Sequence, residues 1–220
     1  MDSLSRPAVR TKKKRRDWLM GLASSHPQWA LGFQDEVWWS RIAQPHLHSW
    51  AEDKKPLRLI EKEVPKGDAD PKALACYGLW LADEDMQEML LRFVDGRPVS
   101  AMTTRYLEWC CQKLWERGKR VLVMVWDNAP WHVSKEVREW IGEHNYKVKY
   151  EGGGNGVRIL ACYLPSKSPW LNPIEPKWLH GKRRVVEADR LLTSKELAQR
   201  VCDTYGTSYE DHLSIPEKVA

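Results

Sequence analysis

The sequence predicts an α/β domain with a mixed β-sheet flanked by helices. The first half of the chain contains apolar runs that are typical of an antiparallel meander of strands. Beyond residue 100, stretches with helical spacing alternate with two continuously apolar runs, which indicates buried strands separated by helices. A meander followed by helix, strand, helix, strand and helix favours a mixed sheet with helices packed on it.

The predicted meander is built from four segments that precede residue 95. Residues 30–39 read ALGFQDEVWW and are expected to form a strand with Leu31, Phe33, Asp35 and Val37 on one face. Residues 56–64 alternate in polarity, and residues 73–82 form a longer apolar run with aromatic side chains. Residues 89–94 follow the acidic stretch 83–85, which is typical of a hairpin turn rather than of a metal site.

After the meander, apolar residues recur every three or four positions between the buried strands. The expected elements are a helix from an N-cap at Ser100 to a C-cap at Gly118, a strand over 120–126, a helix over 133–141, a strand over 157–164 and a helix from Pro173 toward Val186. The glycine-rich residues 151–156 are expected to form a flexible hairpin tip.

The composition excludes several classes of protein. Hydrophobic residues make up 42% and charged residues 30%, which is typical of a globular chain and not of a disordered one. No apolar run approaches the roughly 18 residues that cross a membrane. The basic N-terminus is not followed by the apolar stretch of a signal peptide, so a signal peptide is not expected. The five cysteines are irregularly spaced, which argues against disulfides or a zinc site and for a reducing cytoplasm.

The net charge of +5 lies at the N-terminus. Residues 1–17 carry seven basic and two acidic side chains, and the remainder carries 28 of each. Such a run is either a solvated tail or a contact for a polyanion. We therefore divide the chain into a basic arm over residues 1–26, a main domain over 27–190 and a helical tail over 191–220.

Three acidic side chains lie where chemistry is expected. Asp127 directly follows the apolar strand 120–126, and α/β sheets place their sites at the carboxyl ends of strands. Asp35 interrupts an apolar strand, where a charge is costly unless it is paired or binds a metal. Glu175 follows Asn172 by three residues, so it is either a capping-box glutamate of the last helix or a site residue.

Neighbouring residues have structural alternatives as well. Asp127 could cap the helix that follows it, and His132 is either a packed or capping histidine or a residue that shapes a site. Glu36 alternates to the face opposite Asp35 and is interpreted as a surface charge. Most of the 13 tryptophans are expected in the core, but one or two near a site could stack on exposed bases.

Three motifs carry a resemblance to a known family. They are Phe33-Gln34-Asp35-Glu36, then Asp127-Asn128-Ala129 with His132 and Ser134, then Ser168-Pro169 followed by Leu171-Asn172-Pro173-Ile174-Glu175 and Trp178. With these motifs the chain resembles the catalytic domain of DDE transposases of the mariner superfamily, in particular the bacterial insertion-sequence branch. The resemblance covers roughly residues 17–187 and implies an RNase H-like fold.

The resemblance also implies metal-dependent cleavage and joining of DNA strands. Asp35, Asp127 and Glu175 would be catalytic and would hold Mg²⁺, as two ions, with Mn²⁺ as a substitute. The residues expected to shape the site are Asn128, His132 and Asn172. The cations expected to bind DNA phosphates are Lys12, Lys13, Lys14, Arg15 and Arg16 in the arm, and Lys177, Lys182, Arg183 and Arg184 after Glu175.

The chain departs from the family pattern at three places. Glu175 follows Asp127 by 48 positions, more than is usual, and the excess is assigned to residues 146–156. Pro176 follows Glu175 directly, which is tolerable only where a helix has barely begun. The 34 residues before Asp35 are too few for the helix-turn-helix units that family members carry there.

The expected partners follow from the resemblance and its departures. They are double-stranded DNA, a second copy of the chain on transposon ends and a separately encoded helix-turn-helix half, with no membrane. Two alternatives stay open. One is a non-catalytic DNA-binding or regulatory remnant of a transposase, and the other is a stand-alone RNase H-like nuclease, which the motif around Glu175 disfavours.

Overall fold

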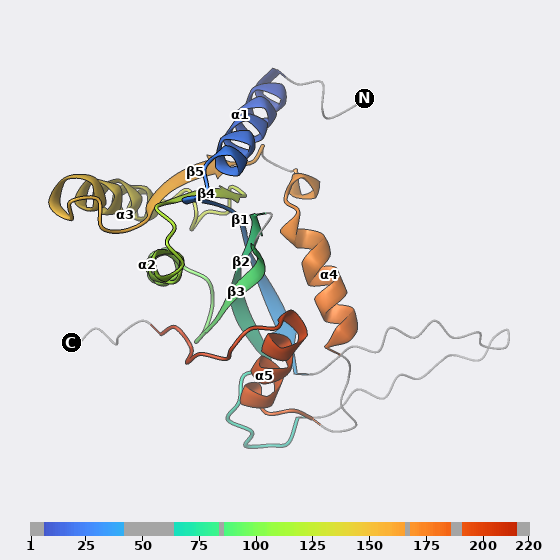
Figure 1. Ribbon diagram of the computed structural model, residues 1–220. Helices are drawn as coiled ribbons and strands as arrows, with labels where there is room; N and C mark the ends of the chain where they lie inside the picture. The colour runs from blue at the N-terminus through green and yellow to red at the C-terminus, as the bar shows by residue number, and fades with distance from the viewer. Residues whose placement is uncertain (1–6, 42–63, 84–85, 166–167, 186–190, 215–220) are drawn as a thin grey trace, which may run out of the picture.

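The described strands form one five-stranded mixed sheet with the order β3-β2-β1-β4-β5. The computed structural model describes residues 7–41, 64–83, 86–165, 168–185 and 191–214 (Figure 1). The strands are β1 (Trp29–Ser40), β2 (Ala73–Asp83), β3 (Met86–Val94), β4 (Val121–Trp126) and β5 (Arg158–Tyr163). β1, β2 and β3 pair antiparallel, whereas β1–β4 and β4–β5 pair parallel, which confirms the predicted mixed sheet.

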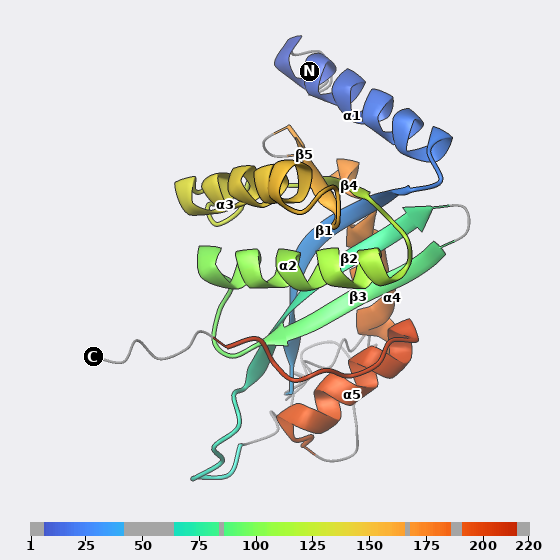
Figure 2. The same cartoon turned by 60° about the vertical axis from the view of Figure 1, so that its left-hand side comes forward.

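Helices cover both faces of this sheet (Figures 1 and 2). They are α1 (Pro7–Ser25), α2 (Ser100–Glu116), α3 (Lys135–Tyr146), α4 (Ile174–Arg184) and α5 (Ser194–Tyr205). Side chains of α2 and α3 share one buried cluster with the sheet, and those of α1, α4 and α5 share the other. The chain is therefore a three-layer α/β domain, as the order of elements predicts.

The central strands are buried on both sides because of these two layers. Every residue of β4 is buried, which explains its continuous run of apolar residues. Along β1, Phe33 and Val37 face the layer of α4 and α5, while Ala30 faces α2 and α3. Each large apolar side chain buried in this way contributes about 1.5–3 kcal/mol.

The glycine-rich segment differs from the predicted hairpin tip. It does not join two paired strands: α3 continues into a π-helical turn over Lys147–Glu151, and the chain then turns into β5. Gly152 N donates to the carbonyl of Lys147 over 2.7 Å and so closes the helix. The hairpin prediction is wrong because β4 and β5 are parallel, and parallel neighbours require a crossover connection, here made by α3.

The basic N-terminal segment is helical over Pro7–Ser25. Leu19 and Ala23, in its second half, are buried in the core that β1 also lines. At the other end of the chain, α5 begins with a capping box between Thr193 and Glu196, and its apolar side enters the same core. Both ends of the chain therefore contribute helices to one face of the sheet.

The carboxyl end of the outer strand β3 is bonded to the segment that follows α5. Leu213 forms a parallel bridge with Val94, donates its N–H to the carbonyl of Phe93 over 2.8 Å and accepts from Asp95 N over 2.9 Å. The guanidinium of Arg92 donates to the carbonyl of Asp211 over 2.7 Å. Residues 211–213 therefore lie against the carboxyl end of this edge strand.

The start of α2 differs by one residue from the predicted helix start. Ser100 is the first residue of α2 rather than its N-cap, because Val99 takes that place and the Ser100 hydroxyl donates to Ser134. The five cysteines are free and buried. The strand expected over 56–64, except its last residue, and the acidic turn at residues 84–85 lie outside the described residues. Among the described helices, none has the length and apolar character that a membrane crossing requires.

Candidate active site

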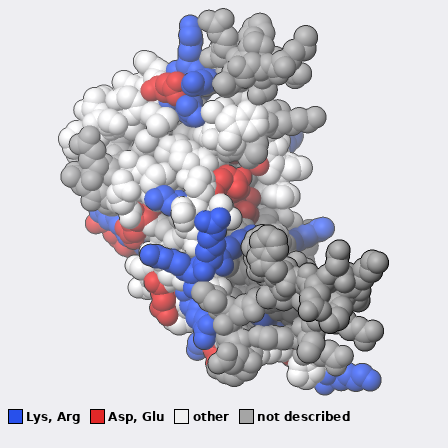
Figure 3. Space-filling model, turned by 90° about the vertical axis from the view of Figure 1, so that its right-hand side faces the viewer, with Lys and Arg blue, Asp and Glu red and all other residues white. Residues whose placement is uncertain are grey.

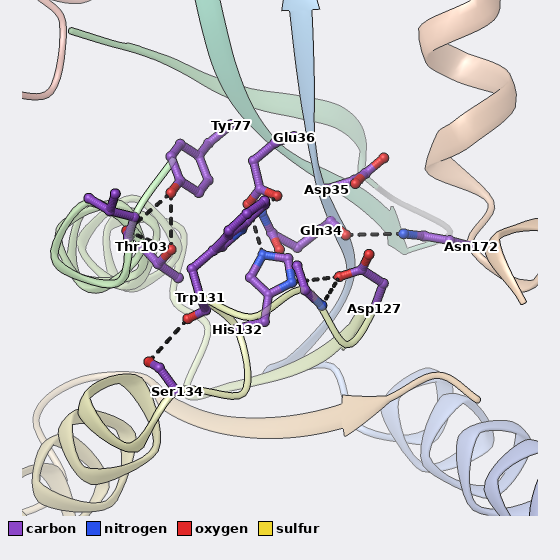
Figure 4. Close-up of polar contacts among 12 residues, drawn as sticks. Gln34, Asp35, Glu36, Tyr77, Thr103, Asp127, Trp131, His132, Ser134 and Asn172 are labelled. Atoms are coloured by element: carbon purple, nitrogen blue, oxygen red, sulfur yellow. Dashed lines mark hydrogen bonds and ion pairs between the residues drawn. The ribbon is translucent and has the colours of Figure 1, made fainter. Parts of the chain in front are cut away.

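Asp35 and Asp127 reach the same level of the sheet from neighbouring parallel strands. The parallel register pairs Phe33 with Val125, and each aspartate lies two residues further along its strand direction. Asp35 shares its face of β1 with Phe33 and therefore points toward α4 (Figure 4). Asp127 is the first residue after β4. The two aspartates predicted to be catalytic thus belong to one site.

Glu175 is brought to the same place by two contacts between α4 and β1. Asn172, just before the helix, donates from Nδ2 to the carbonyl of Gln34 over 3.1 Å. One turn into the helix, the indole N–H of Trp178 donates to Asp35 Oδ2 over 3.0 Å. Glu175 lies between these two anchors, in the first turn of α4.

Glu175 links the three carboxylates electrostatically, because its charge acts on Asp35 and the charge of Asp127 acts on it. Burial, followed by the negative charges of Glu36 and Glu175, raises the pKa of Asp35 to about 7. Burial and the charge of Asp127 raise the pKa of Glu175 above its ordinary value. In the part of the chain that the structure describes, no three His, Cys, Asp or Glu side chains are gathered closely enough to hold a metal ion. The carboxylates are therefore neighbours within electrostatic reach, not a closed set of ligands.

His132 bridges two carboxylates and has no exposed surface (Figure 4). Its Nδ1 lies 2.7 Å from Asp127 Oδ1, and its Nε2 lies 2.8 Å from Glu36 Oε1. The ring also stacks on Trp126 with centroids 4.5 Å apart. Burial alone lowers the pKa of an imidazole, but the two carboxylates outweigh it and raise the pKa of His132 to about 9.

This bridge fixes the orientation of Asp127. Burial raises the pKa of Asp127, but the hydrogen bonds from His132 and from the N–H of Ala129 outweigh this effect. The pKa of Asp127 is therefore below its ordinary value. Both bonds go to the same oxygen, Oδ1, over 2.7 and 2.8 Å. The second oxygen, Oδ2, is therefore left to face a ligand.

Glu36 is a site residue that the sequence interpretation missed. The expectation of a surface charge is wrong, since its side chain is only 8% exposed. Besides His132, it accepts hydrogen bonds from Gln34 Nε2 over 2.8 Å and from Trp131 Nε1 over 3.1 Å. The predicted sheet with flanking helices could have indicated that Glu36 is buried, because a central strand covered by helices on both faces leaves no room for a surface charge.

The two asparagines predicted to shape the site tie its elements together. Asn128 donates from Nδ2 to the carbonyl of Leu164 over 2.5 Å and so joins the end of β4 to the chain after β5. Asn172 is 2% exposed and holds α4 against β1. Within the described ranges, two buried acceptors, Gln34 Oε1 and Asn172 Oδ1, have no hydrogen-bond partner. Polar oxygens without partners at this position are suited to a bound water or cation.

Neither capping alternative is found. Pro173 is the N-cap of α4, and no side chain caps this helix, so Glu175 is not a capping-box residue. Asp127 does not cap α3, because Ser134 accepts from the N–H of Val137 instead. Pro176 falls in the first turn of α4, where its missing N–H costs no intrahelical hydrogen bond.

Basic side chains lie on two sides of the carboxylates. On α1, Lys13, Lys14 and Arg15 are exposed, and Arg16 donates to the carbonyl of Leu171 over 3.1 Å, just before Asn172. Lys12 belongs to the same helix. On α4 the corresponding residues are Lys177, which lies over the Trp80 ring, and the exposed Lys182, Arg183 and Arg184. Figure 3 shows acidic side chains beside Lys and Arg on this face of the molecule.

Comparison with known proteins finds a matching family and similar solved structures. A family model described as DDE superfamily endonuclease matches residues 78–198, which is more than half of the chain. This range contains Asp127 and Glu175 and begins after Asp35. No curated protein matches the chain in sequence.

Similar solved structures include several of Mos1 transposase. The paired-end complex with the left transposon end has a TM-score of 0.60 and 14% identity, covering 94% of this chain and 57% of that chain. The catalytic domain of Mos1 mariner transposase has a TM-score of 0.54 and 12% identity, covering 94% of this chain and 85% of that chain. This chain thus spans little more than half of the Mos1 chain in the complex. The likeness shows the fold, which is RNase H-like as predicted.

Proposed function

The chain belongs to the DDE superfamily endonuclease family, and from this premise we propose that it cuts and joins DNA strands as a transposase catalytic domain. Within that family we assign it to the mariner superfamily, bacterial insertion-sequence branch. The observation that carries the proposal is the convergence of Asp35, Asp127 and Glu175 from β1, β4 and α4.

The donor set fits a divalent cation. Carboxylate oxygens are the ligands that Mg²⁺ prefers, and Asp35, Asp127 and Glu175 would hold it. Burial, followed by the charges of Glu36 and Glu175, raises the pKa of Asp35, and a cation beside this carboxylate would offset that cost of ionisation. When bound, two such ions would activate the attacking hydroxyl and stabilise charge on the leaving oxygen. Two of the similar Mos1 structures are described as complexes with Mn and with Mg, which supports this choice of metal.

The other residues of the site act by positioning these carboxylates. His132, held by Glu36, orients Asp127 so that one of its oxygens is free. Asn172 fixes the start of α4, and Trp178 fixes Asp35 from the next turn. Rigid support of this kind keeps reacting groups within the small tolerance that phosphoryl-transfer chemistry allows.

The proposed partners are double-stranded DNA, a second copy of the chain on transposon ends and a separately encoded helix-turn-helix half. The DNA would meet the cations of α1 on one side of the carboxylates and those of α4 on the other. We place the protein in the cytoplasm, where reducing conditions suit its five free cysteines.

A second candidate is a DNA-binding transposase remnant without catalytic activity. It is favoured by the lack of a closed set of three metal ligands among the described residues. Nicking of supercoiled plasmid by the purified chain separates the two proposals. The catalytic proposal expects nicking in Mg²⁺ and none in EDTA, whereas the remnant binds the plasmid and leaves it intact in both.

Asp35→Asn is expected to stabilise the metal-free protein at pH 8. The pKa of Asp35 is about 7 in the native state and near 3.8 in the unfolded state. Between these values the native state holds more protons, so the free energy of unfolding falls as the pH rises from about 4 to about 7. The amide of Asn does not titrate, so the variant does not lose the roughly 2–4 kcal/mol of unfolding free energy that the wild type loses. Its melting temperature should therefore be higher by about 5–15 °C.

Thermal melting with and without Mg²⁺ checks this expectation. Mg²⁺ should raise the melting temperature of the wild type, because a ligand of the native state stabilises it, and should leave Asp35→Asn almost unchanged. At pH 4 the two proteins should melt at similar temperatures in the absence of metal, since Asp35 is then protonated. An equal response of both proteins to Mg²⁺ would show that Asp35 is not a ligand.

The cations of α1 are expected to determine how steeply DNA binding depends on salt. Each phosphate contact contributes about −0.9 to the slope of log affinity against log salt. Replacing Lys13, Lys14 and Arg15 with glutamine should therefore reduce the magnitude of the slope by up to about 2.7. The substitutions leave Leu19 and Ala23 in the core, so the melting temperature should not change. Titration of a fluorescent duplex at several salt concentrations measures the slope, and an unchanged slope would place the DNA elsewhere.

A further inference from the structure

Trp170 presents a large exposed aromatic surface at the border of the site. Its relative exposure is 58%, and it lies in the 3-10 turn Pro169–Leu171, which leads into α4. The residues around it are fixed, because Ser168 and Asn172 are buried and the carbonyl of Leu171 accepts from Arg16. Within the described chain no other aromatic ring stacks on Trp170. The turn is thus held at a set position while more than half of the surface of Trp170 is exposed to solvent.

The position of this indole is tied to the carboxylates. Asn172 is bonded to the carbonyl of Gln34, which directly precedes Asp35. Consecutive Cα atoms are about 3.8 Å apart, so the Cα of Trp170 lies within about 7.6 Å of that of Asn172. Arg16, reaching across from α1, brings a guanidinium to the same turn. The backbone of Trp170 therefore lies close to the carboxylates, and the guanidinium of Arg16, which also pairs with Asp17, lies at the same turn.

We propose that Trp170 is a stacking platform for an unpaired nucleobase beside the phosphate that is cut. The inference rests on the proposed function, which supplies DNA as the ligand. An indole accepts any base on its face, and nearby cations hold the neighbouring phosphates, as is usual where proteins bind single-stranded nucleic acid. Because the turn is already anchored, no backbone segment has to become ordered when the base stacks.

The platform gives this chain a preference for DNA that has an unpaired base at the site. A base inside a duplex is stacked between its neighbours and must leave the helix before it can stack on a protein side chain. This unpairing costs a few kcal/mol. DNA that already has an unpaired nucleotide avoids this cost. Trp170 would thus favour frayed or nicked ends over an intact duplex, whatever their sequence.

The test measures binding, with Ca²⁺ in place of Mg²⁺ so that cleavage is not required. Two short duplexes carry 2-aminopurine at the same terminal nucleotide, unpaired in one and paired in the other. Wild-type protein should bind the unpaired form more tightly and quench its fluorescence. Trp170→Ala should weaken binding of the unpaired form about fivefold to hundredfold and that of the paired form by less than about twofold.

Two variants serve as controls. Trp170→Phe keeps an aromatic face and should retain most of the quenching. Trp38→Ala removes an indole of 48% exposure from the face of β1 opposite Asp35 and should bind both duplexes as the wild type does. Equal weakening of both duplexes by Trp170→Ala, or no weakening, would overturn the proposal while leaving Mg²⁺-dependent nicking as evidence of catalysis. A chain that never nicks DNA but keeps the contrast between duplexes would refute the catalytic function and not the platform.

Discussion

Replacing Asp35, Asp127 or Glu175 with the corresponding amide is expected to lower Mg²⁺-dependent DNA cleavage by about 10³-fold or more. An amide oxygen carries no charge, and the stabilisation that a metal gives to the transition state is worth several kcal/mol. A loss of 1.36 kcal/mol lowers a rate tenfold, so even part of this stabilisation accounts for the expected effect. Nicking of supercoiled plasmid, followed over time on gels, measures it.

A distant carboxylate provides the matched control. Glu139 lies on α3 with its side chain 59% exposed and pairs with Lys135 on the same helix. Glu139→Gln removes one negative charge as the other variants do and should cleave at the wild-type rate. Circular dichroism should show all four variants folded, and Asp35→Asn should be more stable than the wild type. Wild-type cleavage by any one of the three amide variants would remove that residue from the site.

Gly78→Ala is expected to destabilise the protein and to disturb the site at the same time. Gly78 pairs with Asp35 across β1 and β2, and a Cβ added there would lie 2.2 and 2.5 Å from two ring atoms of Trp178. The indole is rigid and must move, although its N–H holds Asp35. Overpacking of this kind costs about 1–3 kcal/mol, which lowers the melting temperature by about 3–10 °C. Cleavage should fall about tenfold because Asp35 loses its fixed position.

Gly142→Ala tests whether this effect is steric. Gly142 lies within α3, and no atom would come within 4 Å of an added Cβ. Alanine is favoured over glycine inside a helix by about 1 kcal/mol, so this variant should melt at the wild-type temperature or a few degrees higher. Normal stability of Gly78→Ala would mean that Trp178 is not packed against β2.

The sequence predicted three strands of the meander, β1, β2 and β3, and the two parallel strands β4 and β5, although β5 is an edge strand that is only partly buried. β4 reads VLVMVW, and a run of this kind is hard to place anywhere but at the centre of a sheet. The carboxyl end of that strand also predicted where Asp127 lies. The position of Glu175 came from a motif, since its spacing alone fits a capping box equally well.

Contacts between distant segments could not be predicted in this way. Glu36 is bound by Trp131 and His132, about a hundred residues further along the chain, and nothing local distinguishes it from a surface glutamate. The contact of Trp178 with Asp35 likewise depends on the small size of Gly78, in a third element. Such contacts follow from the tertiary arrangement, whereas alternation and capping are properties of a short window.

The segment bonded to the carboxyl end of β3 has a consequence for how copies of this chain behave at high local concentration. An uncovered outer strand offers a row of free N–H and C=O groups on which another chain can continue the sheet. Here Leu213 uses the carbonyl of Phe93 and the N–H of Asp95, and Arg92 draws the same segment inward. A second copy therefore cannot continue the sheet at the carboxyl end of β3, because the N–H and C=O groups that it would need are already used there.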